Sequence, residues 1–223
     1  MKYEQLNKIF YKDNKNYKKF YKNRFESESS YHLNFKIGEN QAFYVVTNEM
    51  LNLALEIQGT VQKIVAVNNS VPPVAQHFFT VSCLIDEMDF TNQFEGVRSS
   101  RRELKEALDV SERKNKKEHV RFLGLVDKYS KMNDELQLST CEDVRALYDQ
   151  LILPEIEKEE DKPDGKIFRK ESVSVMSATQ KEAHRGLLPE DKIIEAMDAA
   201  LKILQQDDIH ILIRICIFHY LLI

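Results

Sequence analysis

Three residues in the middle of the chain, Thr91, Glu95 and Gly96, have types and a spacing that could control chemistry at a nearby site. Thr91 and Glu95 are four residues apart, so on a helix they lie one turn apart on one face, with the Thr hydroxyl placed to hydrogen-bond the carboxylate. Gly96 supplies the left-handed residue that commonly ends a helix. Ser100 and Glu103 have the spacing of a capping box for a second helix. The stretch therefore predicts a carboxylate on the last turn of a helix, held by a tight corner.

A helix over about residues 74–96 must position this carboxylate. Pro72 and Pro73 end the helix before it. Its apolar residues recur at helical spacing and predict one face packed against the body: Phe78, Val81, Ile85 and Met88. After the corner we expect a short helix over Arg101–Val110 and a longer one from Glu112 to about Asn133.

The composition is typical of a globular, largely helical protein. Hydrophobic residues make up 43% and charged residues 30% of the 223 residues, and the six Gly and five Pro are too few for a loop-rich β fold. The net charge of -4 excludes a global basic field for nucleic acid. The first residues contain no apolar signal segment. We therefore expect a cytoplasmic protein without a membrane or nucleic-acid partner.

The cysteines and histidines do not form a recognisable metal site. Cys83, Cys141 and Cys216 are odd in number and widely spaced, so neither zinc nor a disulfide framework is expected. Isolated histidines are more often ordinary surface or core residues than chemical groups, and we assign no role to His77, His119 and His210. No metal ligand is predicted.

The first 30 residues interleave aromatic and basic side chains, a pattern that could bind a nucleic acid. The spacing of Phe10, Tyr17, Phe20 and Tyr21 instead approximates one helical face, so we favour an amphipathic helix that packs its rings on the body. Two segments follow it in our interpretation: a short extended piece over Ser30–Gly38 and a helix over Gln41–Val67.

The second half predicts further helices and one extended flap. Thr140 can cap a helix that runs through Leu151 and ends at Pro154. Residues 158–166 should form an exposed loop. Side chains alternate in Lys166–Lys170 and Ser172–Met176, which predicts a short hairpin or an extended flap.

Two helices should close the chain, one from Glu190 to about Leu204 and one over Ile209–Ile223 capped by Asp207 or Asp208. The last segment is strongly apolar but too short to span a bilayer, which indicates a buried core helix. A chain that ends in mid-helix on Ile223 looks cut rather than finished, and its uncovered apolar surface would favour homo-oligomers or aggregation.

Residues 91–96, Thr-x-x-x-Glu-Gly, together with the flanking Val97, Ser99, Ser100 and Arg101, resemble the inhibitory motif of Fic-family protein adenylyltransferases that carry an inhibitory helix before the catalytic core. Further segments resemble the core of the same family: Leu138–Tyr148, Phe168-Arg169 with Val173–Val175, His184–Pro189 and Ile213–Tyr220.

This resemblance covers roughly residues 30–223. It implies an all-α fold, an incomplete Fic-like helical bundle with a small β-hairpin flap at about residues 165–180. It divides the chain into an N-terminal helical region, residues 1–110, and a partial core, residues 111–223.

The family's signature, His-Pro-Phe-x-Asp/Glu-Gly-Asn-Gly-Arg-x-x-Arg, follows a segment like Phe218-His219-Tyr220 in the family and does not occur in this sequence. Transfer of AMP from ATP to a protein hydroxyl needs a base, a metal and donors for the phosphate charge. No other such set can be assembled, so no catalytic residue is assigned. The resemblance implies ATP and Mg as cofactors of an intact relative, and we expect neither to bind well to this chain, which should be inert as written.

By resemblance, Glu95 would pair with the second arginine of that signature and occupy the place of the ATP γ-phosphate, so that ATP binds non-productively. The alternative is an exposed carboxylate at a helix C-terminus. The local candidates for an ion pair with Glu95 would then be Arg98, Arg101 and Arg102.

The flap residues Val173, Ser174, Val175 and Met176 would, by resemblance, receive a segment of a target protein as an added strand. The alternative is an ordinary hairpin that covers the core. A second hypothesis for the whole chain is a non-catalytic helical interaction module or truncated gene product, which binds protein partners through the flap or the basic N-terminal helix.

Overall fold

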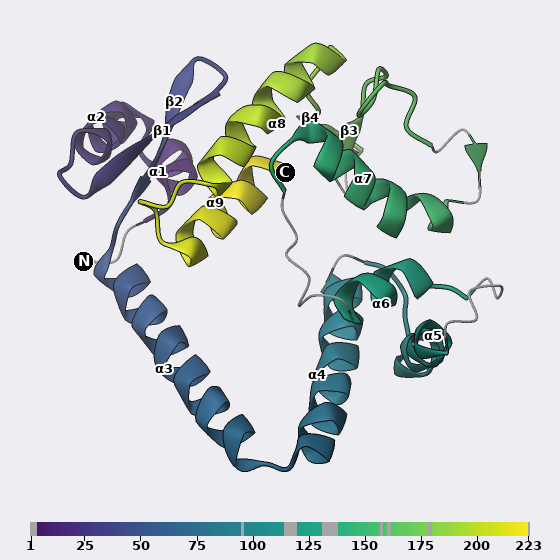
Figure 1. Cartoon of the computed structure of the whole chain (residues 1–223). Coiled ribbons are helices and arrows are strands. Elements are labelled where there is room, and N and C mark those ends of the chain that lie inside the picture. Colours follow the sequence, from purple (N-terminus) through teal and green to yellow (C-terminus); the bar gives the residue numbers. More distant parts are fainter. Residues whose placement is uncertain are drawn as a thin grey trace. The chain divides into compact units, whose positions relative to one another are not determined.

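A computed structural model describes residues 4–94, 96–113, 120–130, 138–156, 158–159, 162–177 and 180–222. Within these ranges the chain forms nine α-helices, a short 3₁₀ helix and two antiparallel two-stranded sheets (Figure 1). In chain order the elements are α1 (Leu6–Lys12), α2 (Asn14–Phe25), β1 (Ser30–Ile37), β2 (Asn40–Val45), α3 (Asn48–Ser70), α4 (Pro73–Phe94), α5 (Arg101–Glu112), α6 (Leu123–Ser130), α7 (Cys141–Leu151), η1 (Leu153–Glu155), β3 (Ser174–Met176), β4 (Glu182–Arg185), α8 (Glu190–Leu204) and α9 (Ile211–Leu222).

The chain packs as two compact units. One unit combines residues 1–64 with residues 206–223, and the other is Val65–Gln205. The cut between them falls inside α3. The boundary that the sequence suggested between residues 110 and 111 stays a prediction.

Aromatic rings hold the first unit together. Tyr21 and Phe25 on α2 contact Phe43 on β2, with ring centroids 5.7 and 5.3 Å apart. Phe25 also lies 4.2 Å from the ring of His32 on β1. These rings are four residues apart on α2 and face the hairpin. The predicted aromatic face is therefore confirmed at Tyr21 and wrong at Phe10 and Phe20, which are 43% and 44% exposed.

The segment from Gln41 was predicted to be helical, and this was wrong for its first residues. Asn40–Val45 pairs with Ser30–Ile37 as an antiparallel hairpin, and the helix begins only at Asn48. Gly38, with φ +59°, makes the reversal possible. Aromatic and β-branched residues then favour a strand because they find cross-strand partners, such as the stacked pair Tyr31 and Tyr44.

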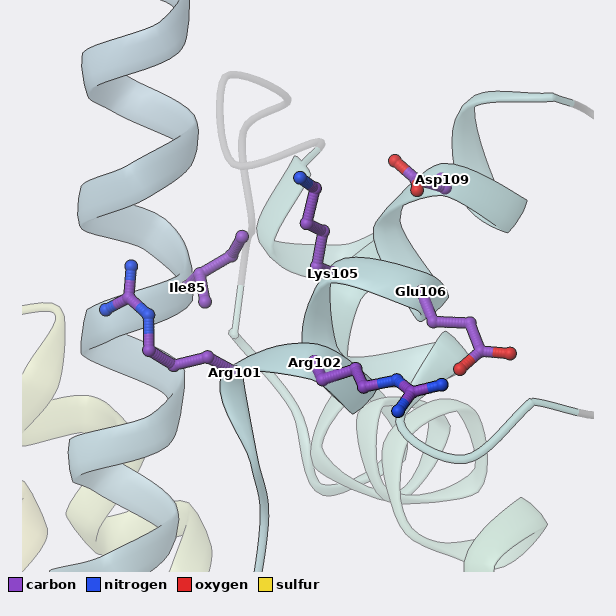
Figure 2. Close-up of a pocket in the computed structure, with 6 residues that line it drawn as sticks. All are labelled: Ile85, Arg101, Arg102, Lys105, Glu106 and Asp109. Carbon is purple, nitrogen blue, oxygen red and sulfur yellow. The ribbon is translucent and has the colours of Figure 1, made fainter.

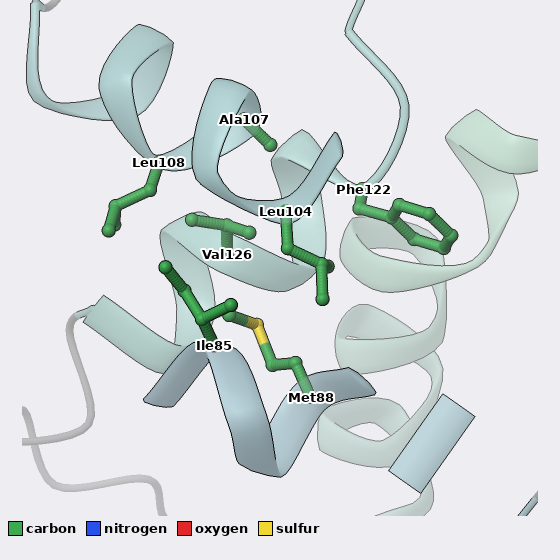
Figure 3. Packing of buried hydrophobic residues seen from close by; sticks show 7 residues of the cluster. All are labelled: Ile85, Met88, Leu104, Ala107, Leu108, Phe122 and Val126. Carbon is green, nitrogen blue, oxygen red and sulfur yellow. The ribbon is translucent and has the colours of Figure 1, made fainter. Parts of the chain in front are cut away.

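The core of the second unit lies between α4, α5 and α6 (Figure 3). Leu104 and Val126 are fully buried there, and Met88 is nearly so. The complete cluster is Ile85, Met88, Leu104, Ala107, Leu108, Phe122 and Val126. The predicted apolar stripe of α4 is therefore confirmed at Ile85 and Met88, whereas Phe78 at its start is 70% exposed.

The long helix expected from Glu112 to Asn133 is interrupted. Residue Glu112 ends α5, and Phe122 has a left-handed backbone, φ +65°, immediately before α6 begins at Leu123. The ring of Phe122 is buried, with the Arg121 guanidinium 4.3 Å from its centre. Burial of this ring in the core is the gain that offsets an unfavourable φ. Residues 114–119 and 131–133 of the predicted helix lie outside the described ranges.

Helix α7 begins and ends where the sequence indicated. Thr140 accepts a hydrogen bond from the N–H of Asp143, and the Asp143 carboxylate accepts one from the N–H of Thr140, which completes a capping box. Pro154 lies in the 3₁₀ turn that follows the helix. Backbone N–H groups of Ser139 and Thr140 hold the pKa of Asp143 below its ordinary value.

The last helix differs from the prediction in its cap and its burial. Neither Asp207 nor Asp208 caps α9: the ring of His210 accepts a hydrogen bond from the N–H of Leu212, 3.3 Å away. Asp207 instead binds Arg214 at 3.1 Å. None of the helix's residues is buried, and Ile215 is 48% exposed. The expectation of a buried core helix was therefore wrong, and the expected exposed apolar surface is present.

No helix in the described part of the chain combines the length and the apolar character needed to cross a membrane.

Candidate functional site

The corner that follows α4 is built as the sequence predicted. Gly96 has φ +75°. Its N–H donates to the carbonyl of Gln93 at 3.2 Å, and the N–H of Val97 donates to the carbonyl of Asn92 at 2.7 Å. These two bonds form a Schellman motif, which satisfies carbonyls at the helix end. Thr91 lies exposed in the last turn, and Glu95 falls outside the described residues, so the predicted contact between them stays a prediction.

Side chains fix the chain on both sides of this corner. Asp89 on α4 accepts hydrogen bonds from Ser99 at 2.8 Å and from Gln93 at 3.0 Å. Ser100 then caps α5, and its hydroxyl donates to the Glu103 carboxylate at 2.7 Å. This bond from Ser100 is the main reason why the pKa of Glu103 is below its ordinary value. The corner is therefore held at both ends.

Arg101 was one of three local partners considered for Glu95, and it forms an ion pair with Asp86 on α4. The sequence did not indicate that Asn92 is part of this corner. Asn92 is 9% exposed, and its side-chain nitrogen has no hydrogen-bond partner among the described residues. Its position on the same helical stripe as Ile85 and Met88 was the available signal.

The predicted flap is a hairpin, but its strands are not the expected ones. β3, Ser174–Met176, pairs with β4, Glu182–Arg185, and residues 166–170 form no strand. Val173, Val175 and Met176 are each more than half exposed. Ser174 on β3 donates to Glu182 on β4 at 2.9 Å, which ties the two strands together, and Arg185, also on β4, binds the same carboxylate at 3.0 Å.

The loop before the hairpin is clamped by a carboxylate of α8. Glu190, the first residue of that helix, accepts backbone hydrogen bonds from Ile167 and Phe168 at 2.8 Å and from Lys166 at 3.1 Å. Bonds from Ile167, Phe168 and Lys166, in that order, hold the pKa of Glu190 below 4.5, its ordinary value. A Cβ on Gly165 would lie 2.5 Å from the same carboxylate, so glycine is needed for this approach.

The other side of this loop is held by α7 and by its own first residues. Arg145 on α7 donates to the carbonyl of Ile167 at 2.9 Å and pairs with Asp149 at 2.7 Å. Asp164 accepts from the N–H groups of Lys170 at 2.8 Å and Glu171 at 3.1 Å, and these bonds lower its pKa. The loop thus joins α7 to α8.

Arg169 continues the same network toward the hairpin. It donates to the carbonyl of Leu187 at 3.4 Å, and its Nε has no hydrogen-bond partner among the described residues. A Cβ on Gly186 would overlap its guanidinium. The N–H of Gly186 donates to the carbonyl of Val173 at 2.8 Å, which brings the end of β4 beside the start of β3. Sequence patterns did not reveal the clamp by Glu190, because it joins residues more than 20 positions apart.

A cavity of about 520 Å³ lies against α4 and α5 (Figure 2). Its lining is Ile85, Arg101, Arg102, Lys105, Glu106 and Asp109. Figure 2 shows that these charged side chains spread in different directions. Since a binding site needs polar groups that converge on one ligand, this cavity does not provide one.

Within the described ranges, no three His, Cys, Asp or Glu side chains gather where they could hold a metal ion. Among the same residues, no hydrogen bond or ion pair joins Thr91 or Gly96 of the corner to Val173–Met176 of the flap.

The three comparisons with known proteins returned nothing: no family model, no curated protein and no solved structure matches this chain.

Proposed function

We propose that this chain is the regulatory region and partial core of an autoinhibited Fic-type protein adenylyltransferase, an enzyme class that transfers AMP from ATP to protein hydroxyls. In this proposal Thr91, Glu95 and Gly96 form the inhibitory corner and the β3–β4 hairpin is the target-binding flap. The residues as written lack the family's catalytic signature, so the proposed role is control and target presentation, without AMP transfer by these residues alone.

The network around Glu190 is the observation that carries the proposal. Three segments that resemble the family's core meet there: Arg145 comes from the first, Arg169 from the second and Gly186 from the third. The three segments are separate in the sequence, yet each contacts the loop that Glu190 clamps or the residues next to that loop. A resemblance due to chance gives no reason for these segments to gather in one place.

The corner adds a second line of support. A Schellman motif, the Asp89 to Ser99 bond and the Ser100 cap hold the residues on both sides of position 95. A carboxylate that must block a phosphate site needs such a fixed backbone, because an inhibitor on a mobile loop loses binding energy to ordering.

The coding DNA beyond the codon for Ile223 gives the first test. An open frame that encodes the His-Pro-Phe signature supports the proposal, whereas a stop codon followed by unrelated sequence contradicts it.

Where the frame continues, the extended chain should be compared with its Glu95→Gly variant in an AMP-transfer assay. We expect at least about tenfold more auto-adenylylation in the variant, because a buried charge pair that holds ATP in the wrong pose is lost. Phe94→Gly places the same helix-weakening residue one position away, at a side chain that is 88% exposed, and should leave activity unchanged. Equal activity of parent and Glu95→Gly would remove the inhibitory role.

A second candidate function, a protein-interaction module without catalysis, is favoured by the exposed side chains of the hairpin. Val175 and Met176 are 58% and 56% exposed on a two-stranded sheet that another strand could extend. The flap of the first proposal has its own test: in an active extended chain, Val175→Pro should impair target modification more than ATP binding. If both fall equally, the hairpin supports the fold and does not bind the target.

A further inference from the structure

Helix α3 is long and apolar, and its apolar side chains are exposed. It has 23 residues, none of which is buried, and only three of them are charged: Glu49, Glu56 and Lys63. Most of its large apolar side chains are about half exposed or more, between 38% and 66%. A helix with so few charges is normally covered on at least one side, because isolated helices gain little stability without packing.

The apolar residues of α3 follow a heptad pattern. Met50, Ala54, Ile57, Val61 and Ile64 are separated by four, three, four and three residues, which places them along one seam of the helix. The three charged residues are seven apart and form a single stripe away from this seam. The helix therefore has the pattern of one member of a helix pair.

This pattern is self-complementary about Gly59. When a second α3 is laid antiparallel across a two-fold axis near residue 59, Ile57 meets Val61 of the other copy and Ala54 meets Ile64. The side chains that flank the seam match as well.

On one flank Leu51 lies opposite Val65 of the second copy, and on the other Leu53 lies opposite Val67. The polar flanking residues meet their own kind at the axis, Gln58 with Gln58 and Thr60 with Thr60. Apolar residues thus meet apolar ones and polar residues meet polar ones near the axis, as an isologous interface requires, and the exception lies at the end of the seam, where Met50 is opposite Asn68. An unrelated protein partner would not need this symmetry.

We infer that α3 is a dimerisation helix, which packs against the α3 of a second copy of this chain in antiparallel orientation. This inference does not depend on the proposed function. Antiparallel helices also bring opposite ends of the two helix dipoles together, which favours this orientation over the parallel one.

The exposed area indicates a dimer of moderate affinity. Seven Leu, Ile and Val side chains of each copy would pack in the interface. A full side chain of this kind has about 60–120 Å² of apolar surface, of which about half is exposed here. The two copies together would therefore remove on the order of 600 Å² of apolar surface from water. Since interfaces are roughly 60% apolar, the total is about 1,000 Å², the lower limit for a specific interface. A dissociation constant of about 1–100 µM is expected.

Sedimentation velocity of the complete 223-residue chain over about 1–200 µM tests this. The parent should shift from monomer to dimer. The variant Ile57→Lys/Val61→Lys should raise the dissociation constant about 100-fold or more, because it puts two charges at the centre of the seam. Leu55→Lys/Gln62→Lys adds the same charge on the outer face and should dimerise like the parent, and circular dichroism should show equal helicity. A monomer at every concentration, or a dimer unaffected by the seam variant, overturns the inference.

Disulfide trapping tests the register without changing an apolar residue. In a Cys83→Ser/Cys216→Ser background, Thr60→Cys should form a cross-linked dimer when diamide oxidises the paired thiols, because residue 60 faces itself only in the antiparallel register. Gln62→Cys, two residues away on the outer face, should give several-fold less cross-linked dimer. Equal trapping at the two positions, or more at residue 62, overturns the proposed interface.

Discussion

The guanidinium of Arg169 occupies the space that a Cβ atom on Gly186 would need. Glycine at this position lets the chain leave β4 close to Arg169, while its N–H bonds the carbonyl of Val173 at 2.8 Å. The two residues therefore fix where the hairpin begins and ends relative to the clamped loop.

Replacing Gly186 with alanine should lower the free energy of unfolding by about 1–3 kcal/mol, because the added methyl group displaces the Arg169 side chain. Gly59→Ala is the matched control: nothing lies within 4 Å of a Cβ there, and alanine in a helix interior should raise stability by about 0.5–1 kcal/mol. Urea unfolding measures both. In an Arg169→Ala background the cost of Gly186→Ala should fall to what remains from the Cβ lying 3.1 Å from the carbonyl oxygen of Val173, and equal costs in the two backgrounds would show that Arg169 is not the cause.

Gly96→Ala should be destabilising for a different reason. Nothing lies within 4 Å of a Cβ at this residue, so space is available, but φ is +75°. A left-handed conformation costs an alanine about 1–2 kcal/mol. Gly96→Asn should cost less, because asparagine tolerates this region. Thermal or urea unfolding measures the stability of the three proteins. Equal stability of the alanine, asparagine and glycine proteins would contradict the left-handed backbone assigned to residue 96.

Acid should release the loop that Glu190 clamps. The pKa of Glu190 is lower in the folded chain than its ordinary value of 4.5, so its stabilisation is complete above that pH and is lost as the pH falls below it through the folded pKa. Hydrogen exchange of the Ile167 and Phe168 amides, followed by NMR, should accelerate relative to intrinsic rates below about pH 4.5.

Glu190→Ala should remove this protection at every pH. Asp191→Asn changes a neighbouring exposed carboxylate in the same helical turn and should leave both amides protected. Protection that persists in Glu190→Ala would contradict the clamp.

Two of the three thiols should react in the native protein. Cys141 is buried and donates to Asp198 at 3.1 Å, and burial, followed by this bond, raises the pKa of the thiol to about 12. At pH 8 only about one Cys141 in 10⁴ is then a thiolate, so it should react slowly. Cys83 and Cys216 are exposed. Ellman's reagent should therefore titrate two thiols rapidly and the third only on unfolding in denaturant. Rapid reaction of all three thiols would contradict the buried environment of Cys141.

The parts of the fold that the sequence predicted are those that depend on neighbouring residues. Thr140 with Asp143, Ser100 with Glu103, and Gly96 each mark a helix end through bonds made within a few positions. Such local signals do not need the rest of the chain.

The errors concern residues whose partners are distant. Residues 41–45 were assigned to a helix because Phe43 and Val46 fit the stripe of the following helix, whereas pairing with β1 decides their structure. β4 has no clear alternation of apolar residues, and it becomes a strand through its pairing with β3. Glu190 looks like an ordinary first-turn acid in the sequence, and only the structure brings a loop to its carboxylate.

The first unit is discontinuous: residues 1–64 share it with residues 206–223, and Val65–Gln205 lies between them in the sequence. On a ribosome that adds about 5–20 residues per second, the N-terminal aromatic hairpin would emerge roughly 10–30 s before the segment that completes its unit. All residues of the inserted unit are synthesised before residues 206–223, so this unit can fold while the first unit is still incomplete. An N-terminal half left unfinished for that long is exposed to chaperones and proteases during synthesis.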